Sequence, residues 1–372
     1  MSGTNLPRRH GGRGEKPIWV FVFCLSSVLS VPPWWNSAAA AGFPWVRYAA
    51  KPDDWYRSPD GRRVADNLLS QQSPLGSWPK NFDTSAKAYD GKPADIKGTF
   101  DNGATIGETR FLARAYRASQ DPKYRDAVMK AIDHILKAQY ANGGWPQSYP
   151  PGNGYHRHIT FNDNAMVNLM RLLREVATGD SFAFVDASRR QSAQAAFDRG
   201  VACILKCQIV VNGKKTAWCA QHDETDFQPR PARTYELVSL SGSESVDIVR
   251  LLMSLEKPSP EVIAAIDGAV KWFDEAKLTG IKQVFVPDPQ AARGRNKVVV
   301  KDPDAPPMWA RFYEIGTNRP IFSDRDGVPK RELADIGYER RNGYSWLGTW
   351  PADLLAKDYP AWKAKWRASD GK

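Results

Sequence analysis

Apolar residues recur at helical spacing in three consecutive pairs of segments, and short polar loops separate one pair from the next. Each pair is typical of a helical hairpin with one apolar face. A hairpin of this kind cannot bury that face alone, whereas three hairpins arranged in a ring share one core. The predicted helices are 105–119 and 121–140, 165–178 and 191–209, and 245–255 and 260–276.

A tryptophan stands in the loop before each predicted hairpin. Trp78, Trp145 and Trp218 are 67 and 73 residues apart. This near-constant spacing predicts equivalent loops that lie at one end of the ring. The alternative is an ordinary helical array in which the loop tryptophans are unrelated.

Two of the turns before helices begin in the same way. Residues 99–104 read TFDNGA and residues 160–165 read TFNDNA, 61 positions later, so Asp101 and Asp163 stand at matching helix starts. Asp and Asn are preferred helix N-caps, and capping alone is one explanation. Each turn nevertheless carries more carboxylate and amide oxygen than one cap uses, which predicts two acidic turns facing a common centre.

The remaining segments differ from the helical repeats. Residues 42–98 show little regular pattern, whereas 284–286 and 297–301 read as short strands within loops rich in Arg, Tyr and Gly. We therefore expect an all-α dominated fold with long loops and a few short strands. Residues 42–372 are expected to form a single catalytic domain.

Residues 1–41 predict a signal peptide. A basic start is followed by 14 apolar residues at 18–31, too few to span a bilayer comfortably, and by small residues at 37–41. We expect a secreted or periplasmic protein without stable membrane association after cleavage; an uncleaved anchor is the alternative. The mature chain keeps an odd number of cysteines, Cys203, Cys207 and Cys219, which we interpret as mainly structural.

The net charge of +11 and the pI near 9.4 indicate an acidic partner. Aromatic residues make up 11% of the chain, which suits an acidic polysaccharide or a nucleic acid. The chain shows no sequence signature of nucleic-acid binding. We expect a monomer that binds an acidic polysaccharide and no nucleic acid. Arg233 and Arg319 lie in loops beside Pro and aromatic residues, where a guanidinium can grip a sugar carboxylate.

Five motifs resemble those of family 10 polysaccharide lyases, which are calcium-dependent pectate lyases. The resemblance covers about residues 45–365. Two departures are a Ser at position 77, where Gly is more usual, and Thr at position 234; neither removes a reacting group. The motifs lie at 99–105, 143–147, 159–165, 232–236 continuing through 241–245, and 312–313 continuing through 318–320.

The resemblance implies an (α/α)3 toroid and β-elimination of polygalacturonate. It places calcium-site carboxylates on Asp101 and Asp163, the catalytic base on Arg233 and a substrate-gripping role on Arg319. Asn102 adds a further oxygen of the type that Ca²⁺ prefers. Other expected substrate-binding residues are Lys80, Asn81, His222, Tyr313, Arg341 and Tyr344.

The chemistry leaves alternatives open. An arginine base is physically awkward because its ordinary pKa exceeds about 12, and the residues alone do not favour Arg233 over Lys80 or His222. A lyase for another polyuronate such as alginate is one alternative function. An inverting glycoside hydrolase with Asp101 and Asp163 as acid and base is another, and a non-catalytic pectin-binding module is a third.

Overall fold

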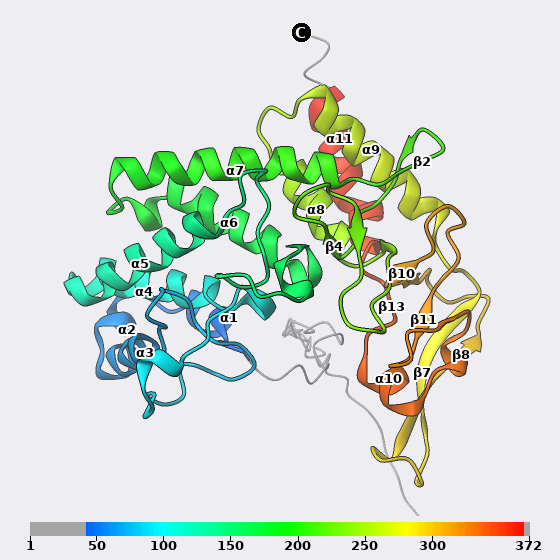
Figure 1. Cartoon of the computed structure of the whole chain (residues 1–372), viewed down its shortest axis with the longest axis horizontal. Helices are drawn as coiled ribbons and strands as arrows, with labels where there is room; N and C mark the ends of the chain where they lie inside the picture. The colour runs from blue at the N-terminus through cyan, green and yellow to red at the C-terminus, as the bar shows by residue number, and fades with distance from the viewer. Residues whose placement is uncertain (1–41, 368–372) are drawn as a thin grey trace, which may run out of the picture. The chain divides into compact units, whose positions relative to one another are not determined.

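The computed structural model describes residues 42–367, and the predicted signal peptide lies outside them. Helices dominate the described part of the chain (Figure 1). The α-helices are α1 Trp45–Ala49, α2 Asp53–Arg57, α3 Pro59–Ser70, α4 Ile106–Ser119, α5 Pro122–Ala138, α6 Ala165–Thr178, α7 Ala187–Cys207, α8 Glu244–Met253, α9 Pro260–Glu275, α10 Tyr338–Gly343 and α11 Tyr359–Arg367. A π-helix, η7 Leu354–Asp358, precedes α11. The 3₁₀ turns are η1 Pro93–Asp95, η2 Asp101–Gly103, η3 Tyr155–Arg157, η4 Asn162–Asn164, η5 Asp180–Phe182 and η6 Leu333–Asp335.

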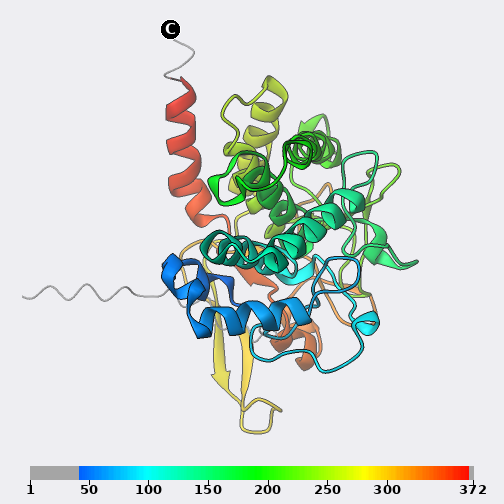
Figure 2. The ribbon, with the colours of Figure 1, turned by 90° about the vertical axis from the view of Figure 1, so that its left-hand side faces the viewer.

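The strands are short except for one hairpin. β7 Ile281–Pro287 and β8 Arg295–Lys301 pair antiparallel over their whole length, and Figure 2 shows this hairpin projecting beyond the helices. The others are β1 Ile159–Thr160, β2 Val210–Val211, β3 Lys214–Lys215, β4 Gln221–His222, β5 Pro229–Arg230, β6 Leu240–Ser241, β9 Trp309–Ala310, β10 Phe312–Tyr313, β11 Phe322–Ser323, β12 Pro329–Lys330 and β13 Leu347–Gly348. β4 lies between β1 and β5, and β10 pairs with β6.

The helices form three hairpins arranged as two rows. Within the hairpins, α4 packs on α5, α6 on α7 and α8 on α9. Between the hairpins, α6 contacts both α4 and α8 in one row, and α7 contacts both α5 and α9 in the other. In Figure 1 the α4–α7 helices lie side by side in cyan and green. This arrangement confirms the predicted toroid of helical hairpins.

The two rows begin differently. In the row α3, α5, α7 and α9, every helix starts at a Ser or Asp whose side chain accepts a first-turn N–H, namely Ser58, Asp121, Asp186 and Ser259. The helices α4, α6 and α8 have no side-chain cap and begin directly from polar turns. Their uncapped, partly positive N-termini therefore stand at the end of the ring that holds those turns.

Four buried tryptophans join the rows. Each indole N–H donates to a backbone carbonyl in the last turns of a helix: Trp78 to Leu68, Trp145 to Ile135, Trp218 to Ile204 and Trp309 to Phe273, at 2.7–2.9 Å. The backbone carbonyl of three of them accepts the N–H that opens the next turn, from Thr99, Thr160 and Ser241. The predicted equivalence of the tryptophan loops is thus a repeated hydrogen-bond pattern, and Trp309 adds a fourth member that the spacing did not reveal.

The segment before the first hairpin corrects one prediction. Residues 42–98 were expected to lack regular structure, yet they contain α1, α2 and α3. α3 follows the N-cap Ser58 and the first-turn Pro59, and its buried face includes Val64 and Leu68. It thereby supplies the first helix of the capped row.

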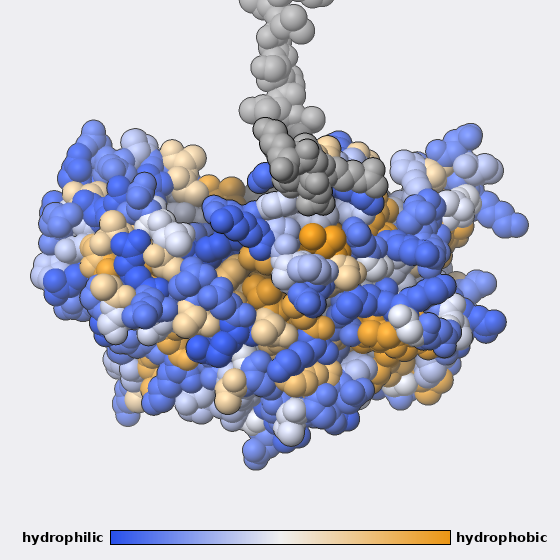
Figure 3. Space-filling model, turned by 90° about the horizontal axis from the view of Figure 1, so that it is seen from above, coloured by the Kyte–Doolittle hydropathy of each residue, from blue (hydrophilic) through white to orange (hydrophobic). Residues whose placement is uncertain are grey.

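The surface of the described chain is mixed. Hydrophilic residues cover most of the face shown in Figure 3 and interrupt its hydrophobic patches. None of the described helices has both the length and the apolar character that crossing a membrane requires. Cys203, Cys207 and Cys219 are buried free thiols, which agrees with a structural role.

We predict that Trp218→Phe lowers the free energy of unfolding by about 1–3 kcal/mol, because it leaves the buried Ile204 carbonyl without its donor. Trp45→Phe is the matched control, since the half-buried Trp45 has no indole hydrogen bond among the described residues. Urea unfolding of both variants tests this. Equal losses in the two variants would contradict an anchoring role for the indole N–H.

Candidate functional site

The two predicted acidic turns pack against each other, but the aspartate stands one position later in the second turn than in the first. η2 and η4 are in contact, and the second residue of each turn has a left-handed backbone, Asn102 at φ 52° and Asp163 at φ 49°. Asp101 therefore corresponds to Asn162, and both are buried. The repeat supplies one carboxylate and one amide from each turn, in opposite order.

Neither aspartate caps a helix. Asp101 accepts the N–H of Asn102 within its own turn and forms an ion pair with Lys80. Its side chain is only 5% exposed. Asn102 donates to Asn81 Oδ1 at 3.0 Å. The structure thus brings Lys80 and Asn81 to the first turn and contradicts capping as the explanation of Asp101.

Asp163 meets a buried arginine that the sequence did not single out. Arg311 Nη2 lies 3.1 Å from Asp163 Oδ1 and 3.2 Å from Asn162 Oδ1, and it also pairs with Glu244. Burial alone would lower the pKa of Arg311, but the carboxylate of Glu244 and then other charged groups outweigh it and raise that pKa. Arg311 therefore stays a cation that joins the second turn to the start of α8.

Arg233 is held by a neighbouring carboxylate. Its Nε lies 2.8 Å from Glu236 Oε2, and its Nη2 donates to Glu236 Oε1, so the pair is bidentate. Tyr344 donates its hydroxyl to the same Glu236 Oε1 at 2.7 Å. The Glu236 side chain is 4% exposed whereas that of Arg233 is 43% exposed, so a buried carboxylate orients a solvent-facing guanidinium.

The pairing also fixes the charge state of Arg233. Burial would lower the pKa of Arg233, but its hydrogen bonds to Glu236 and the charge of that carboxylate outweigh burial and raise the pKa above the ordinary arginine value. In Glu236, burial raises the pKa and the pairing with Arg233 lowers it, with a net lowering. Both groups are therefore ionised in this arrangement.

Aromatic rings connect the two halves of the site. The Tyr344 ring lies 4.9 Å from the Arg311 Cζ and 5.8 Å from the Arg233 Cζ, measured to its centroid. Burial raises the pKa of Tyr155, and the charges of Arg233, Glu236 and Asp101 also act on it. Burial lowers the pKa of His156, and the charges of Lys80 and Asp101 also act on it. The acidic turns and the Arg233 pair consequently belong to one region.

The oxygens of the two turns fit a calcium ion in their chemistry. Asp101, Asn102 and Asp163 offer hard oxygen ligands, and the buried Asn164 Oδ1 in the second turn has no hydrogen-bond partner among the described residues. A cation that binds Asp101 competes with the Lys80 ammonium.

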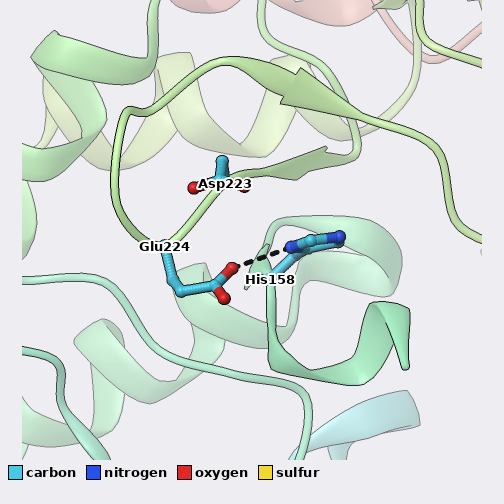
Figure 4. A group of neighbouring side chains, drawn as sticks. All are labelled: His158, Asp223 and Glu224. Atoms are coloured by element: carbon cyan, nitrogen blue, oxygen red, sulfur yellow. Dashed lines mark hydrogen bonds and ion pairs between the residues drawn. The ribbon is translucent and has the colours of Figure 1, made fainter. Parts of the chain in front are cut away.

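A different group of metal-ligand atoms lies on neighbouring loops. Ligand atoms of His158, Asp223 and Glu224 lie within 4.8 Å of one another, and His158 Nδ1 is 2.8 Å from Glu224 Oε2 (Figure 4). Arg157 already pairs with Glu224 and Arg230 with Asp223. With both carboxylates neutralised, these residues form an ion-pair cluster that joins the segment before β1 to the loop between β4 and β5.

Two expected substrate contacts, His222 and Tyr313, are corrected by their burial. His222 is fully buried, where its Nε2 accepts the Cys219 N–H and its Nδ1 bonds to the Phe227 carbonyl. Tyr313 is also fully buried and bonds to the backbone of Ala276 and Ala310. Polar atoms that satisfy the interior in this way are not available to a polysaccharide.

Arg341 bonds to Asn296 and to the backbone carbonyls of Ala334 and Ile336, and has no contact with the two turns or with Arg233. Its described bonds hold α10 against β8, and its substrate role stays a prediction. Arg319 is exposed after β10 and forms no side-chain hydrogen bond or ion pair among the described residues. Its substrate role stays a prediction.

Comparison with known proteins decides the family. The model of the pectic acid lyase family matches residues 56–355. The chain belongs to this family. Two solved structures of the family 10 polysaccharide lyase from Cellvibrio cellulosa are similar to it, which confirms the expected resemblance. No curated protein matches the chain.

The similarity to the Cellvibrio cellulosa lyase is extensive. One structure, an aspartate-to-alanine mutant in complex with trigalacturonic acid, is 37% identical with a TM-score of 0.71, covering 84% of this chain and 95% of that one. The other is 38% identical with a TM-score of 0.72, covering 84% and 94%. The pectic acid lyase fold therefore extends over most of the chain.

Sequence reasoning missed Glu236, Glu244 and Arg311 as members of this lyase site. Glu236 and Glu244 stand inside the motif at 232–245, so its acidic positions were a usable signal. Arg311 lies 148 residues from its partner Asp163, and no local pattern links the two.

We predict that His222 makes folding sensitive to acid. Burial lowers its pKa from the ordinary 6.5 to about 4, so between these values the unfolded chain binds a proton that the folded chain excludes. Stability should therefore fall as pH drops through that window. Urea unfolding at pH values near its two ends should show a smaller loss for His222→Gln than for wild type. An unchanged pH dependence in the variant would contradict this assignment.

Proposed function

We propose that this lyase is a calcium-dependent pectate lyase that cleaves α-1,4-linked polygalacturonate by β-elimination and leaves 4,5-unsaturated oligogalacturonides. The observation that carries the proposal is the solvent-facing Arg233, which the Tyr344 ring links to Arg311 and so to the two packed acidic turns with Asp101 and Asp163. The Cellvibrio cellulosa lyase was solved with trigalacturonic acid, an oligomer of the proposed substrate.

Asp101, Asn102 and Asp163 would hold the calcium ion. When bound, Ca²⁺ draws charge from a uronate carboxylate and so acidifies the adjacent C5–H. Lys80 pairs with Asp101 and Arg311 with Asp163, so a calcium ion would compete with these two cations for the carboxylates. Arg319, exposed and unpaired within the described chain, would grip a second sugar carboxylate.

Arg233 would accept the C5 proton. The C5–H electron pair forms the C4–C5 double bond, the C4–O4 bond breaks, and the leaving oxygen takes a proton from water. A guanidinium must lose a proton before it can accept one, and Glu236 opposes that loss. The solvent-facing position of Arg233 supports the role of base. Its raised pKa supports a second role, in which charged Arg233 binds a substrate carboxylate.

The nearest alternatives act on other polyuronates or by hydrolysis. Asp163 is paired with Arg311 and Asp101 with Lys80, so neither carboxyl group is left free to act as the proton donor that an inverting hydrolase needs.

We expect purified protein to generate the ultraviolet absorbance of a conjugated double bond from polygalacturonate, and to lose this activity with a chelator. Added Ca²⁺ should restore it, because Asp101 and Asp163 supply hard oxygen ligands. A reducing-sugar assay with alginate and polygalacturonate serves as the control for substrate and bond chemistry. New reducing ends without ultraviolet absorbance would indicate hydrolysis, and full activity after exhaustive chelation would exclude a calcium requirement.

Arg233 variants separate its possible roles. If Arg233 accepts the proton, Arg233→Ala should abolish kcat with little change in KM, and Arg233→Lys should rescue poorly because Lys lacks the planar fork. If Arg233 only grips a carboxylate, KM should rise and kcat should largely recover at saturation. Melting temperatures of both variants control for the loss of the Glu236 pair, and near-normal kcat in Arg233→Ala removes it from the mechanism.

A further inference from the structure

The turn of the β7–β8 hairpin and the first residues of β8 carry three cations without a carboxylate partner. Arg293, Arg295 and Lys297, called here the hairpin cations, lie farther than 4.0 Å from every carboxylate oxygen of the described residues. Neighbouring cations differ: Arg325 and Arg340 both pair with Glu339. An uncompensated cluster of this kind is open to an anionic partner.

The hairpin cations are close enough to repel one another. Burial, followed by the charges of Arg293 and Arg295, lowers the pKa of Lys297 to about 8. The Lys297 side chain is buried and its Nζ donates to the Tyr344 carbonyl at 2.7 Å, a neutral acceptor. Holding like charges together opposes folding, and a bound anion would relieve this repulsion.

An exposed aromatic ring lies among these charges. Phe285 is 47% exposed and pairs with Lys297 across the two strands. Its ring centroid lies 4.3 Å from the Arg295 Cζ and 5.7 Å from the Lys297 Nζ. A ring that can pack on a pyranose, flanked by cations that can bind carboxylates, matches the chemistry of a uronate sugar.

The hairpin is structurally joined to the candidate site. Tyr344, whose carbonyl binds Lys297, donates its hydroxyl to Glu236, the partner of Arg233. Helix α10 lies beside the hairpin in Figure 1, and Tyr338 at its start accepts the Arg293 N–H and donates to the Arg295 carbonyl.

Arg340 on the same helix lies 4.6 Å from the Tyr235 ring, and the Arg233 Cζ lies 5.0 Å from that ring. Arg233 and Arg340 therefore flank the same ring, and helix α10 carries both Arg340 and the Tyr338 that bonds to the hairpin backbone.

We propose that the exposed Arg293 and Arg295, together with Phe285, form a distal binding surface for the acidic polysaccharide chain, beyond the sugars at the reacting centre, while the buried Lys297 ties β8 to Tyr344. The proposal rests on the proposed pectate lyase function. A polyuronate carries one carboxylate on every sugar, so a long chain held near Arg233 can engage the hairpin as well. The second contact is then intramolecular and strengthens binding of long chains alone.

The test compares a long with a short substrate. In the double variant Arg293→Ala with Arg295→Ala, kcat/KM on polygalacturonate should fall about 3- to 30-fold, mainly through KM, whereas kcat/KM on trigalacturonate should change less than about 2-fold. Arg62→Ala with Arg117→Ala is the matched control for two lost charges, because both side chains are exposed and unpaired among the described residues. Equal losses on both substrates, or no loss on the polymer, would overturn the proposal.

Two further measurements keep the outcomes distinct. Arg295→Lys retains the charge and should keep most of the polymer preference, and melting temperatures report whether the exposed hairpin stays folded. If wild type shows no elimination, the proposed function fails. Calorimetric titration of wild type and the double variant with polygalacturonate then tests the surface directly, and equal affinities would reject it.

Discussion

The position of the site depends on the hydrogen bond between a buried indole N–H and the last turns of a helix. The bond recurs at Trp78, Trp145, Trp218 and Trp309. In three of these residues the backbone carbonyl also accepts the N–H that opens the next polar turn. Because both bonds are buried, losing either leaves an unpaired polar group. One residue type thus connects a capped helix to an uncapped one and places every turn at the same end of the ring.

The repeated part of this architecture was predictable because its signals are local. Helical periodicity, the Asx-rich turns and three loop tryptophans all lie within short windows of sequence. The helices of residues 42–98 were not predicted because α1 and α2 have only five residues each, and α3 follows two short segments with Pro. Trp309 was not predicted as a fourth member because the β7–β8 hairpin separates it from Trp218, so the regular spacing of the loop tryptophans is lost.

The site was predictable only in part, for a related reason. Asp101, Asn102 and Asp163 stand out because a repeated turn presents them, and Lys80 and Asn81 follow the first loop tryptophan. Tyr313 belongs to a family-like motif and His222 follows the third loop tryptophan, yet their polar atoms satisfy neighbouring backbone groups in the interior. A motif identifies residues that the fold requires together with those that a substrate requires, and burial separates the two classes. Arg311 needed the structure, since its contacts cross between repeats.

The charges of the chain divide into two functional groups. At the centre, Lys80, Arg311 and Arg233 each face a carboxylate, so most of the local charge is cancelled within ion pairs. The net charge of +11 must therefore act mainly through cations elsewhere, and the unpaired hairpin cations are among them. The unpaired cations thus attract an acidic polymer over long range, whereas the ion-paired residues at the centre bind one sugar of that polymer. This division allows the centre to balance its charges closely while the protein as a whole still attracts its substrate.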